Sequence, residues 1–167
     1  MKGYFKISNL IEGVSDPGET TTSINFFDAY KDRTPDMEMM LRIHLKMGHL
    51  NDYCKAGVLR DYAVYVGGRE CLDYMKIEAE LEKLFKVKPE NWNDVKDWHV
   101  KFEGIHPFGD GNGRVGRMLM AVQCFQLGLL DILNEEFLVN ADVNIQDIRN
   151  EYYPWFKSDE DKLKWFL

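Results

Sequence analysis

Cysteine is scarce in this sequence, and its spacing does not fit a metal site. The residues Cys54, Cys71 and Cys124 are odd in number, and none of them lies in a Cys-x-x-Cys pair. A disulfide framework is therefore excluded, and we expect free or buried thiols in a reducing compartment.

Long apolar runs and excess positive charge are also missing. No run reaches the roughly 18 apolar residues that a membrane helix needs, and no secretory leader is visible, so we expect a cytoplasmic protein without a membrane partner. The net charge of −7 makes a nucleic-acid backbone an unsuitable partner, because phosphate binding on that scale needs a basic face. No internal repeats are present.

What the sequence does contain is helical periodicity. The 167 residues, 45% of them hydrophobic, suffice for one domain, 1–167, with its own core. Apolar spacing and capping residues predict an all-α fold. The predicted helices cover 4–13, 23–30 with Ser23 as N-cap, 34–53, 71–87, 91–104, the segment from about 113 to 127, and two more within 140–167, broken near Pro154 or Ser158; 14–22 and 129–139 are predicted connections.

One stretch carries the chemistry. Residues 106–117 contain one imidazole, one carboxylate, four glycines and two guanidiniums, directly before an apolar helix. Gly111 and Gly113 allow successive backbone N–H groups to turn inward, and the following helix N-terminus favours a phosphate. Because Asp110 would repel that anion, we expect Mg²⁺ between them. His106 is then placed to remove a proton from an attacking hydroxyl.

Other interpretations of this stretch are weaker. Gly111 to Gly116 matches the G-x-G-x-x-G dinucleotide pattern, with Asp131 beyond it, but that pattern requires a preceding strand, whereas 92–105 has helical spacing. A P-loop would need Gly-Lys-Ser/Thr, which does not follow. A simple Gly/Asn turn with a solvated arginine pair stays possible, although it leaves the imidazole and the carboxylate unexplained.

The stretch resembles the motif of the Fic family, His-x-Phe-x-Asp/Glu-Gly-Asn-Gly-Arg-x-x-Arg, and every defined position is matched. The resemblance implies a helical fold that transfers AMP from ATP to a Ser, Thr or Tyr hydroxyl of a target protein. Related kinases of the death-on-curing type have Lys where this chain has Gly113, which argues against phosphate transfer. By the resemblance, His106 is the base, Phe108 an apolar anchor and Asp110 the Mg²⁺ ligand, and the nucleotide-binding residues are Asp110, Gly111, Asn112, Gly113, Arg114, Val115, Gly116 and Arg117.

The predicted helix 4–13 resembles the inhibitory helix of Fic proteins, Ser/Thr-x-x-x-Glu-Gly/Asn-Asn. Ser8, Glu12 and Gly13 match it, and Val14 stands where the family has Asn. The resemblance implies that Glu12 pairs with Arg117 and obstructs the γ-phosphate. A surface glutamate before a helix-capping glycine is the simpler alternative.

Two further segments are expected around the site. Residues 55–68 are β-like and predict a hairpin, similar to the family's flap, which aligns an extended target segment by strand addition. Arg149 to Tyr153 resembles the Arg-x-x-Tyr-Tyr segment that lies against the adenine. The site-facing flap residues are Val64, Tyr65, Val66 and Gly67, and the adenine contacts are Tyr152 and Tyr153.

The sequence leaves alternatives open. The same site would suit removal of AMP from a modified target, with Glu12 orienting a water, or a nucleotide-binding interaction module without turnover. A homo-oligomer is also possible. His44 and His49 have no third ligand nearby and are expected to be structural or exposed, and His99 is expected to be a hydrogen-bonded core histidine.

Overall fold

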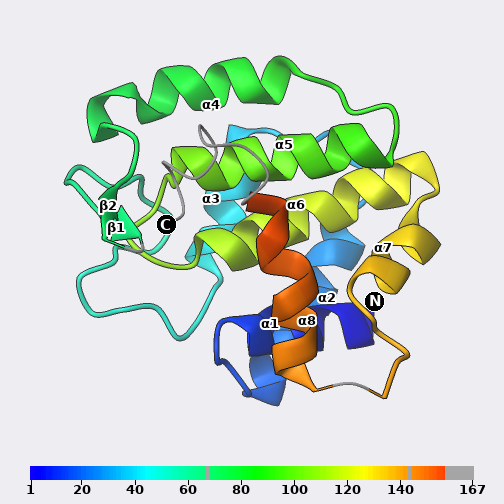
Figure 1. The fold of residues 1–167 in the computed structure, drawn as a ribbon. Coiled ribbons are helices and arrows are strands. Elements are labelled where there is room, and N and C mark those ends of the chain that lie inside the picture. The colour runs from blue at the N-terminus through cyan, green and yellow to red at the C-terminus, as the bar shows by residue number, and fades with distance from the viewer. Residues whose placement is uncertain (67, 143, 157–167) are drawn as a thin grey trace.

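The computed structural model describes residues 1–66, 68–142 and 144–156, and it is built of helices with one short strand pair (Figure 1). None of the helices in these ranges is long and apolar enough to cross a bilayer. The elements are α1 (Lys2–Ile11), α2 (Pro17–Tyr30), α3 (Met37–Leu45), β1 (Tyr65–Val66), β2 (Arg69–Glu70), η1 (Tyr74–Lys76), α4 (Ile77–Lys86), α5 (Trp92–Ile105), α6 (Asn112–Leu127), α7 (Leu130–Glu136), α8 (Ile145–Tyr152) and η2 (Tyr153–Phe156).

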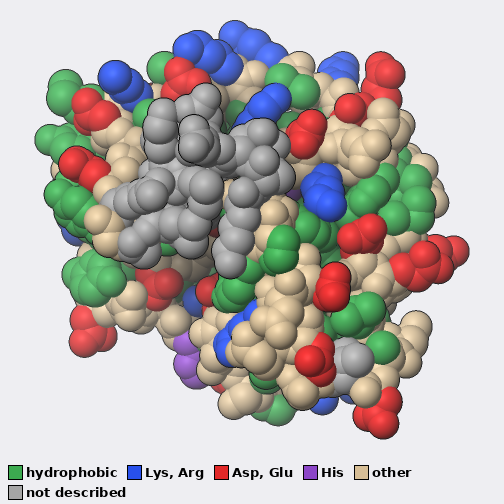
Figure 2. Space-filling view, in the orientation of Figure 1, with side chains coloured by type: hydrophobic (Ala, Val, Ile, Leu, Met, Phe, Trp, Pro, Cys, Tyr) green, Lys and Arg blue, Asp and Glu red, His purple; other side chains and the backbone are tan. Residues whose placement is uncertain are grey.

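Helix α6 lies at the centre of the fold. All its residues from Arg114 to Cys124 are buried. Helix α5 packs along it, α4 covers α5, and α1, α2, α3 and α7 surround the rest (Figure 1). Because α6 begins directly after the glycine-rich loop, the loop is anchored to the most buried element of the molecule. Lys and Arg side chains gather along the outer edge over α4, consistent with the solvated charged face of an amphipathic helix (Figure 2).

The first helix is part of the core. Tyr4 and Phe5 are 0% and 2% exposed, and the Tyr4 hydroxyl donates to the Arg117 carbonyl oxygen at 2.8 Å. The helix ends two residues before the predicted end, with Glu12 as C-cap and Gly13 at φ +77°, a backbone conformation that glycine adopts at little cost. Glu12 therefore projects from the helix end.

Two predictions for the N-terminal half are wrong. Residues 17–22 belong to α2 rather than to a loop, because Asp16 caps the helix by accepting from the Gly18 N–H at 2.8 Å and Pro17 suits the first turn. Ser23 is therefore inside that helix. The predicted helix 34–53 is limited to Met37–Leu45, capped by Asp36, and 46–51 form a loop that reaches the site.

The predicted hairpin exists, but its position is shifted. Tyr65 pairs with Glu70 and Val66 with Arg69, so β2 begins after residue 68, where the sequence had predicted the end of the hairpin. Residues 55–64 form no strand. This segment contains Arg60, whose hydrogen bonds are described below. Gly67, expected in the flap, lies outside the described residues.

The C-terminal half differs in detail. The predicted helix 71–87 is η1 followed by α4, because the Asp73 cap starts a separate turn, in which Met75 is 80% exposed. The predicted connection 129–139 contains α7. The predicted break near Pro154 is present, since α8 ends at Tyr152; any helix beyond 156 lies outside the described residues.

Candidate active site

A cavity of about 470 Å³ lies at the start of α6. One side of the cavity is formed by the glycine-rich loop and Arg117, and another by the aromatic residues of α8 and η2. Two segments distant in sequence close it, the C-cap of α1 and strand β1. The lining residues include Glu12, Val66, Glu103, His106, Asp110, Gly111, Asn112, Gly113, Arg117, Tyr152 and Tyr153.

The loop is held rigidly by its own side chains. Asn112 accepts from the Phe108 N–H and donates to the Phe108 carbonyl, both at 2.9 Å. The Phe108 ring is fully buried and stacks on His44 at a centroid distance of 3.7 Å. Gly111 has φ +82°, and a Cβ there would lie 2.9 Å from the side chains of Leu50 and Met47. The backbone at the start of α6 is thus preorganised to present its free N–H groups.

His106 has the protonation state that a base needs. It ends α5 in the left-handed conformation, at φ +51°. Burial lowers the pKa of His106 to about 4, so the imidazole is neutral near pH 7. Its Nδ1 lies 3.3 Å from the Glu103 carbonyl, which can only accept, so the proton is assigned to Nδ1, and the Nε2 lone pair has no partner among the described residues.

Asp110 is oriented by three contacts. Its two carboxylate oxygens accept from the N–H groups of Asn51 and Gly111, at 2.9 and 2.7 Å, and its carbonyl bonds His44 Nε2 at 2.9 Å. Each oxygen has further capacity to accept, and Asp110 lines the cavity. No group of three or more His, Cys, Asp or Glu among the described residues could hold a metal by itself, so a cation here would need ligands from a substrate.

The Arg117 guanidinium is 1% exposed and nearly saturated with hydrogen bonds. Its Nε donates to Ser8 Oγ, its Nη2 to the Ser8 carbonyl and to Glu12 Oε1, and its Nη1 to the Tyr152 hydroxyl. These bonds use four of its five N–H groups. One N–H on Nη1 remains for a ligand in the cavity.

Glu12 pairs with Arg117 beside the start of α6. Its Oε1 lies 2.6 Å from Arg117 Nη2, and a Cβ on Gly113 would collide with the same carboxylate. Burial pushes the pKa of Glu12 upward, but the charge and hydrogen bond of Arg117 outweigh it, and the pKa lies below its ordinary value. The side chain is still 38% exposed. A carboxylate paired with Arg117 therefore lies beside Gly113 at the start of α6.

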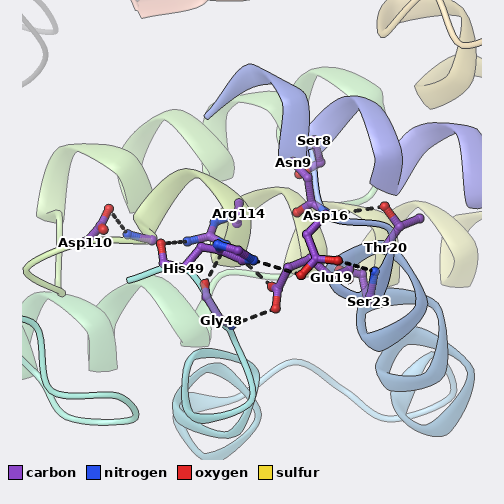
Figure 3. Close-up of polar contacts among 12 residues, drawn as sticks. Ser8, Asn9, Asp16, Glu19, Thr20, Ser23, Gly48, His49, Asp110 and Arg114 are labelled. Carbon is purple, nitrogen blue, oxygen red and sulfur yellow. Dashed lines mark hydrogen bonds and ion pairs between the residues drawn. The ribbon is translucent and has the colours of Figure 1, made fainter. Parts of the chain in front are cut away.

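Arg114 does not line this cavity. It donates to the carbonyls of Gly48 and His49, at 2.9 and 3.2 Å, and lies 3.6 Å from Glu19, as Figure 3 shows. In this structure Arg114 binds the loop 46–51. The sequence analysis had instead predicted that Arg114 binds a phosphate.

The remaining predicted residues are distributed as follows. Val115 is fully buried in the core and does not line the cavity. Gly116 faces the side chains of Glu103 and His99, which leave no room for a Cβ. Of the flap residues, Val66 lines the cavity, Tyr65 is 64% exposed, and Val64 is half-buried, its carbonyl accepting from Cys71 N–H. Tyr153 lines the cavity and is 41% exposed, whereas Tyr152 is 3% exposed.

Comparison with known proteins decides the family. The sequence profile of the Fic/DOC family matches residues 34–124, which is more than half of the chain. The chain belongs to the Fic/DOC family. The match includes the whole motif and α3 to α5, while α1 and its Glu12 lie outside it.

Two relatives illustrate the similarity. A protein of Aquifex aeolicus (strain VF5), named as a probable protein adenylyltransferase, is 48% identical over 46 residues, which cover 26% of this chain and 14% of the relative. The crystal structure of a Fic family protein from Desulfovibrio desulfuricans G20 superposes with a TM-score of 0.61 at 18% identity, over 94% of this chain and 52% of that one. This chain thus spans only part of both relatives. The structural likeness confirms the predicted all-α Fic-type fold.

The structure adds a residue that sequence reasoning missed. Arg60 is 4% exposed and donates to the carbonyls of His106, Tyr62 and Leu72, at 2.8, 2.9 and 2.6 Å. It therefore joins the Fic loop to the segments on either side of the flap. An isolated arginine in a β-like stretch has no spacing that would reveal this function.

We expect Arg60→Ala to lower both stability and activity. The substitution leaves buried carbonyls without donors, and each lost hydrogen bond of a charged group is worth about 1.5–3 kcal/mol. Urea unfolding should show a loss of at least about 3 kcal/mol, with Arg33→Ala, at an exposed site, as the matched control. Equal urea midpoints for the two variants would contradict a stabilising role of the Arg60 hydrogen bonds.

Proposed function

We propose that this protein transfers AMP from Mg-ATP to a hydroxyl side chain of a target protein. The observation that carries the proposal is the neutral His106 imidazole, with Nε2 unpartnered among the described residues, in one cavity with the start of α6 and with Arg117. The imidazole suits proton removal, and the start of α6 and Arg117 suit a polyphosphate. Family membership and the name of the Aquifex relative support the same activity.

The reaction is a displacement at the α-phosphorus. The target oxygen forms a bond to that phosphorus, its proton passes to His106 Nε2, and the bond to the bridging oxygen breaks, so that pyrophosphate leaves. Catalysis of this kind depends on positioning and on charge neutralisation. The N–H groups of Asn112 and Gly113 and the Arg117 guanidinium would supply both.

Asp110 would hold the magnesium ion. Mg²⁺ is usually bound by one or two carboxylates together with substrate phosphates and water, which fits a site with a single oriented carboxylate. When bound, the ion would neutralise phosphate charge. The bonds from Asn51 and Gly111 keep the carboxylate directed toward the cavity.

The walls of the cavity indicate where the other groups lie. Tyr153 exposes its ring to the cavity and is suited to the adenine, while Val66 places the edge of β1 at the opposite side. A target segment that pairs with this edge would bring its hydroxyl to His106 by main-chain hydrogen bonds.

In the same proposal Glu12 inhibits the enzyme. Its carboxylate already uses Arg117 Nη2 and covers Gly113, so a triphosphate would have to displace it. Since Glu12 follows the end of α1 and is partly exposed, its side chain can leave without the helix unfolding.

Labelled ATP tests the proposal. The Glu12→Gly variant incubated with lysate should pass label from α-labelled ATP to protein at a rate well above wild type, because the obstruction is removed. Label from γ-labelled ATP, which kinases of the lysate also transfer, should not rise above its level with wild type. Glu136→Gly, also an exposed glutamate at a helix end, is the matched control and should behave as wild type.

Three outcomes would contradict the proposal in different ways. A rise in label from the γ position would indicate phosphate transfer. Release of AMP from a modified protein by wild type, without transfer by either variant, would favour the reverse hydrolytic activity. ATP binding without any labelling would favour an interaction module.

A further inference from the structure

Two buried polar atoms lie unpaired behind Arg117. His99 Nδ1 and Glu103 Oε1 have no hydrogen-bond partner among the described residues, although His99 is 0% and Glu103 5% exposed. Both atoms face the same point: a Cβ on Gly116 would lie 2.9 Å from the first and 2.7 Å from the second. Buried groups of this kind are rarely left unpaired without a reason.

Donor and acceptor counting fixes the protons nearby. Arg117 Nη1 can only donate, and it donates to the Tyr152 hydroxyl oxygen at 3.1 Å. The Tyr152 hydrogen is then left for His99 Nε2, 2.8 Å away, which must accept it. Burial, helped by the charge of Arg117, lowers the pKa of His99 to about 3, so the ring is neutral and carries its hydrogen on Nδ1. Nδ1–H has no acceptor among the described residues.

Glu103 supplies the acceptor. Its Oε1 is the other unpaired atom beside Gly116, and in the proposed chain it accepts from His99 Nδ1–H. Burial raises the pKa of Glu103 to about 8, against the opposing effect of Arg117, so the carboxyl stays neutral near pH 7 and repels no phosphate in the cavity it lines. Only glycine at 116 leaves space for this arrangement.

We propose that Glu103, His99 and Tyr152 form a buried hydrogen-bonded chain that positions the Arg117 guanidinium for a polyphosphate, and that positioning, not base stacking, is the function of Tyr152. The chain runs from Arg117 Nη1–H to the Tyr152 oxygen, from Tyr152 O–H to His99 Nε2, and from His99 Nδ1–H to Glu103. This inference rests on the proposed function in one respect, that Arg117 binds the phosphates.

The burial of Tyr152 supports this assignment. Its ring packs edge-on against Trp155 and Phe156 and tilted against Phe137, and it is 3% exposed, so no ring face is open to a base. The other bonds of Arg117 go to Ser8 and Glu12. When Glu12 leaves the site, Tyr152 is the described partner outside α1 that still fixes the guanidinium.

Removing one oxygen atom tests the chain. In the Glu12→Gly background, Tyr152→Phe should weaken binding of inorganic tripolyphosphate and of ATP by the same factor, about tenfold, because a hydrogen bond of a charged group is lost. Adenosine binding should not change. Tyr74→Phe, an exposed tyrosine in η1, is the matched control. Calorimetry gives all three affinities, and thermal unfolding verifies that the variants are folded.

A partner substitution and a nucleotide-free measurement complete the test. Glu103→Gln keeps an acceptor oxygen and should retain tripolyphosphate binding, whereas Glu103→Leu should lose it as Tyr152→Phe does. Nitrogen-15 spectra of wild-type histidines should show His99 protonated on Nδ1 and not titrating above pH 5.

The outcomes separate the two proposals. Unchanged tripolyphosphate affinity in Tyr152→Phe, weaker adenosine binding instead, or His99 protonated on Nε2 would overturn the chain. If the Glu12→Gly parent binds no polyphosphate, the proposed function fails, and the His99 spectrum still decides whether the chain exists.

Discussion

Replacing His106 with alanine should reduce AMP transfer by about 10²- to 10⁴-fold, the usual effect of losing a positioned general base. The reason is specific to this ring: Nδ1 is bonded to the Glu103 carbonyl, so Nε2 is the atom that can accept the proton of the target hydroxyl. ATP affinity should stay within about twofold, because the imidazole is not among the proposed phosphate ligands. Transfer of α-label in the Glu12→Gly background measures the rate.

The pH dependence of kcat/KM is a second test of the role of His106. Because burial holds the pKa of His106 at about 4, the base is unprotonated from pH 7 down to about 5, and the acid limb of kcat/KM should appear only below that range. His49→Ala, which loses an exposed pair with Asp16, is the control and should keep the wild-type rate. Undiminished transfer by His106→Ala would remove this residue from the mechanism.

Replacing Phe5 with alanine should lower the free energy of unfolding by about 3–5 kcal/mol, the cost of a large cavity in a well-packed core. Phe5 is 2% exposed and its ring packs against Tyr4 and Phe27. Lys6→Ala, on the exposed face of the same helix, should leave stability within about 0.5 kcal/mol. Urea unfolding at equilibrium measures both.

The comparison with Glu12→Gly shows how inhibition would be relieved. Since α1 is a core helix, we expect the Glu12 substitution to activate without much loss of stability, and the Phe5 substitution to destabilise without comparable activation. The inhibitory step is then a movement of the Glu12 side chain. A Phe5→Ala variant that is fully stable and as active as Glu12→Gly would show instead that the whole helix detaches.

The sequence alone predicted the features that depend on residues close to one another in the chain. The motif from His106 to Arg117, the start of α6 at Asn112 and helix α5 follow from glycine, capping and apolar spacing, which act over one or two turns. Family membership follows from the same motif. The sequence predicted that a strand pair exists but misplaced it along the chain, because short β-like runs do not specify their register.

The tertiary structure decided which of these side chains face the cavity. Arg114 and Arg117 are three residues apart on one helix, and periodicity cannot choose between them; Glu19 and the loop carbonyls draw the first away, while Ser8, Glu12 and Tyr152 hold the second in place. Buried charges and polar groups need partners, and those partners come from segments up to 109 residues away in the chain. Contacts at such separations are set by the packing of the helices, which no local pattern in the sequence records.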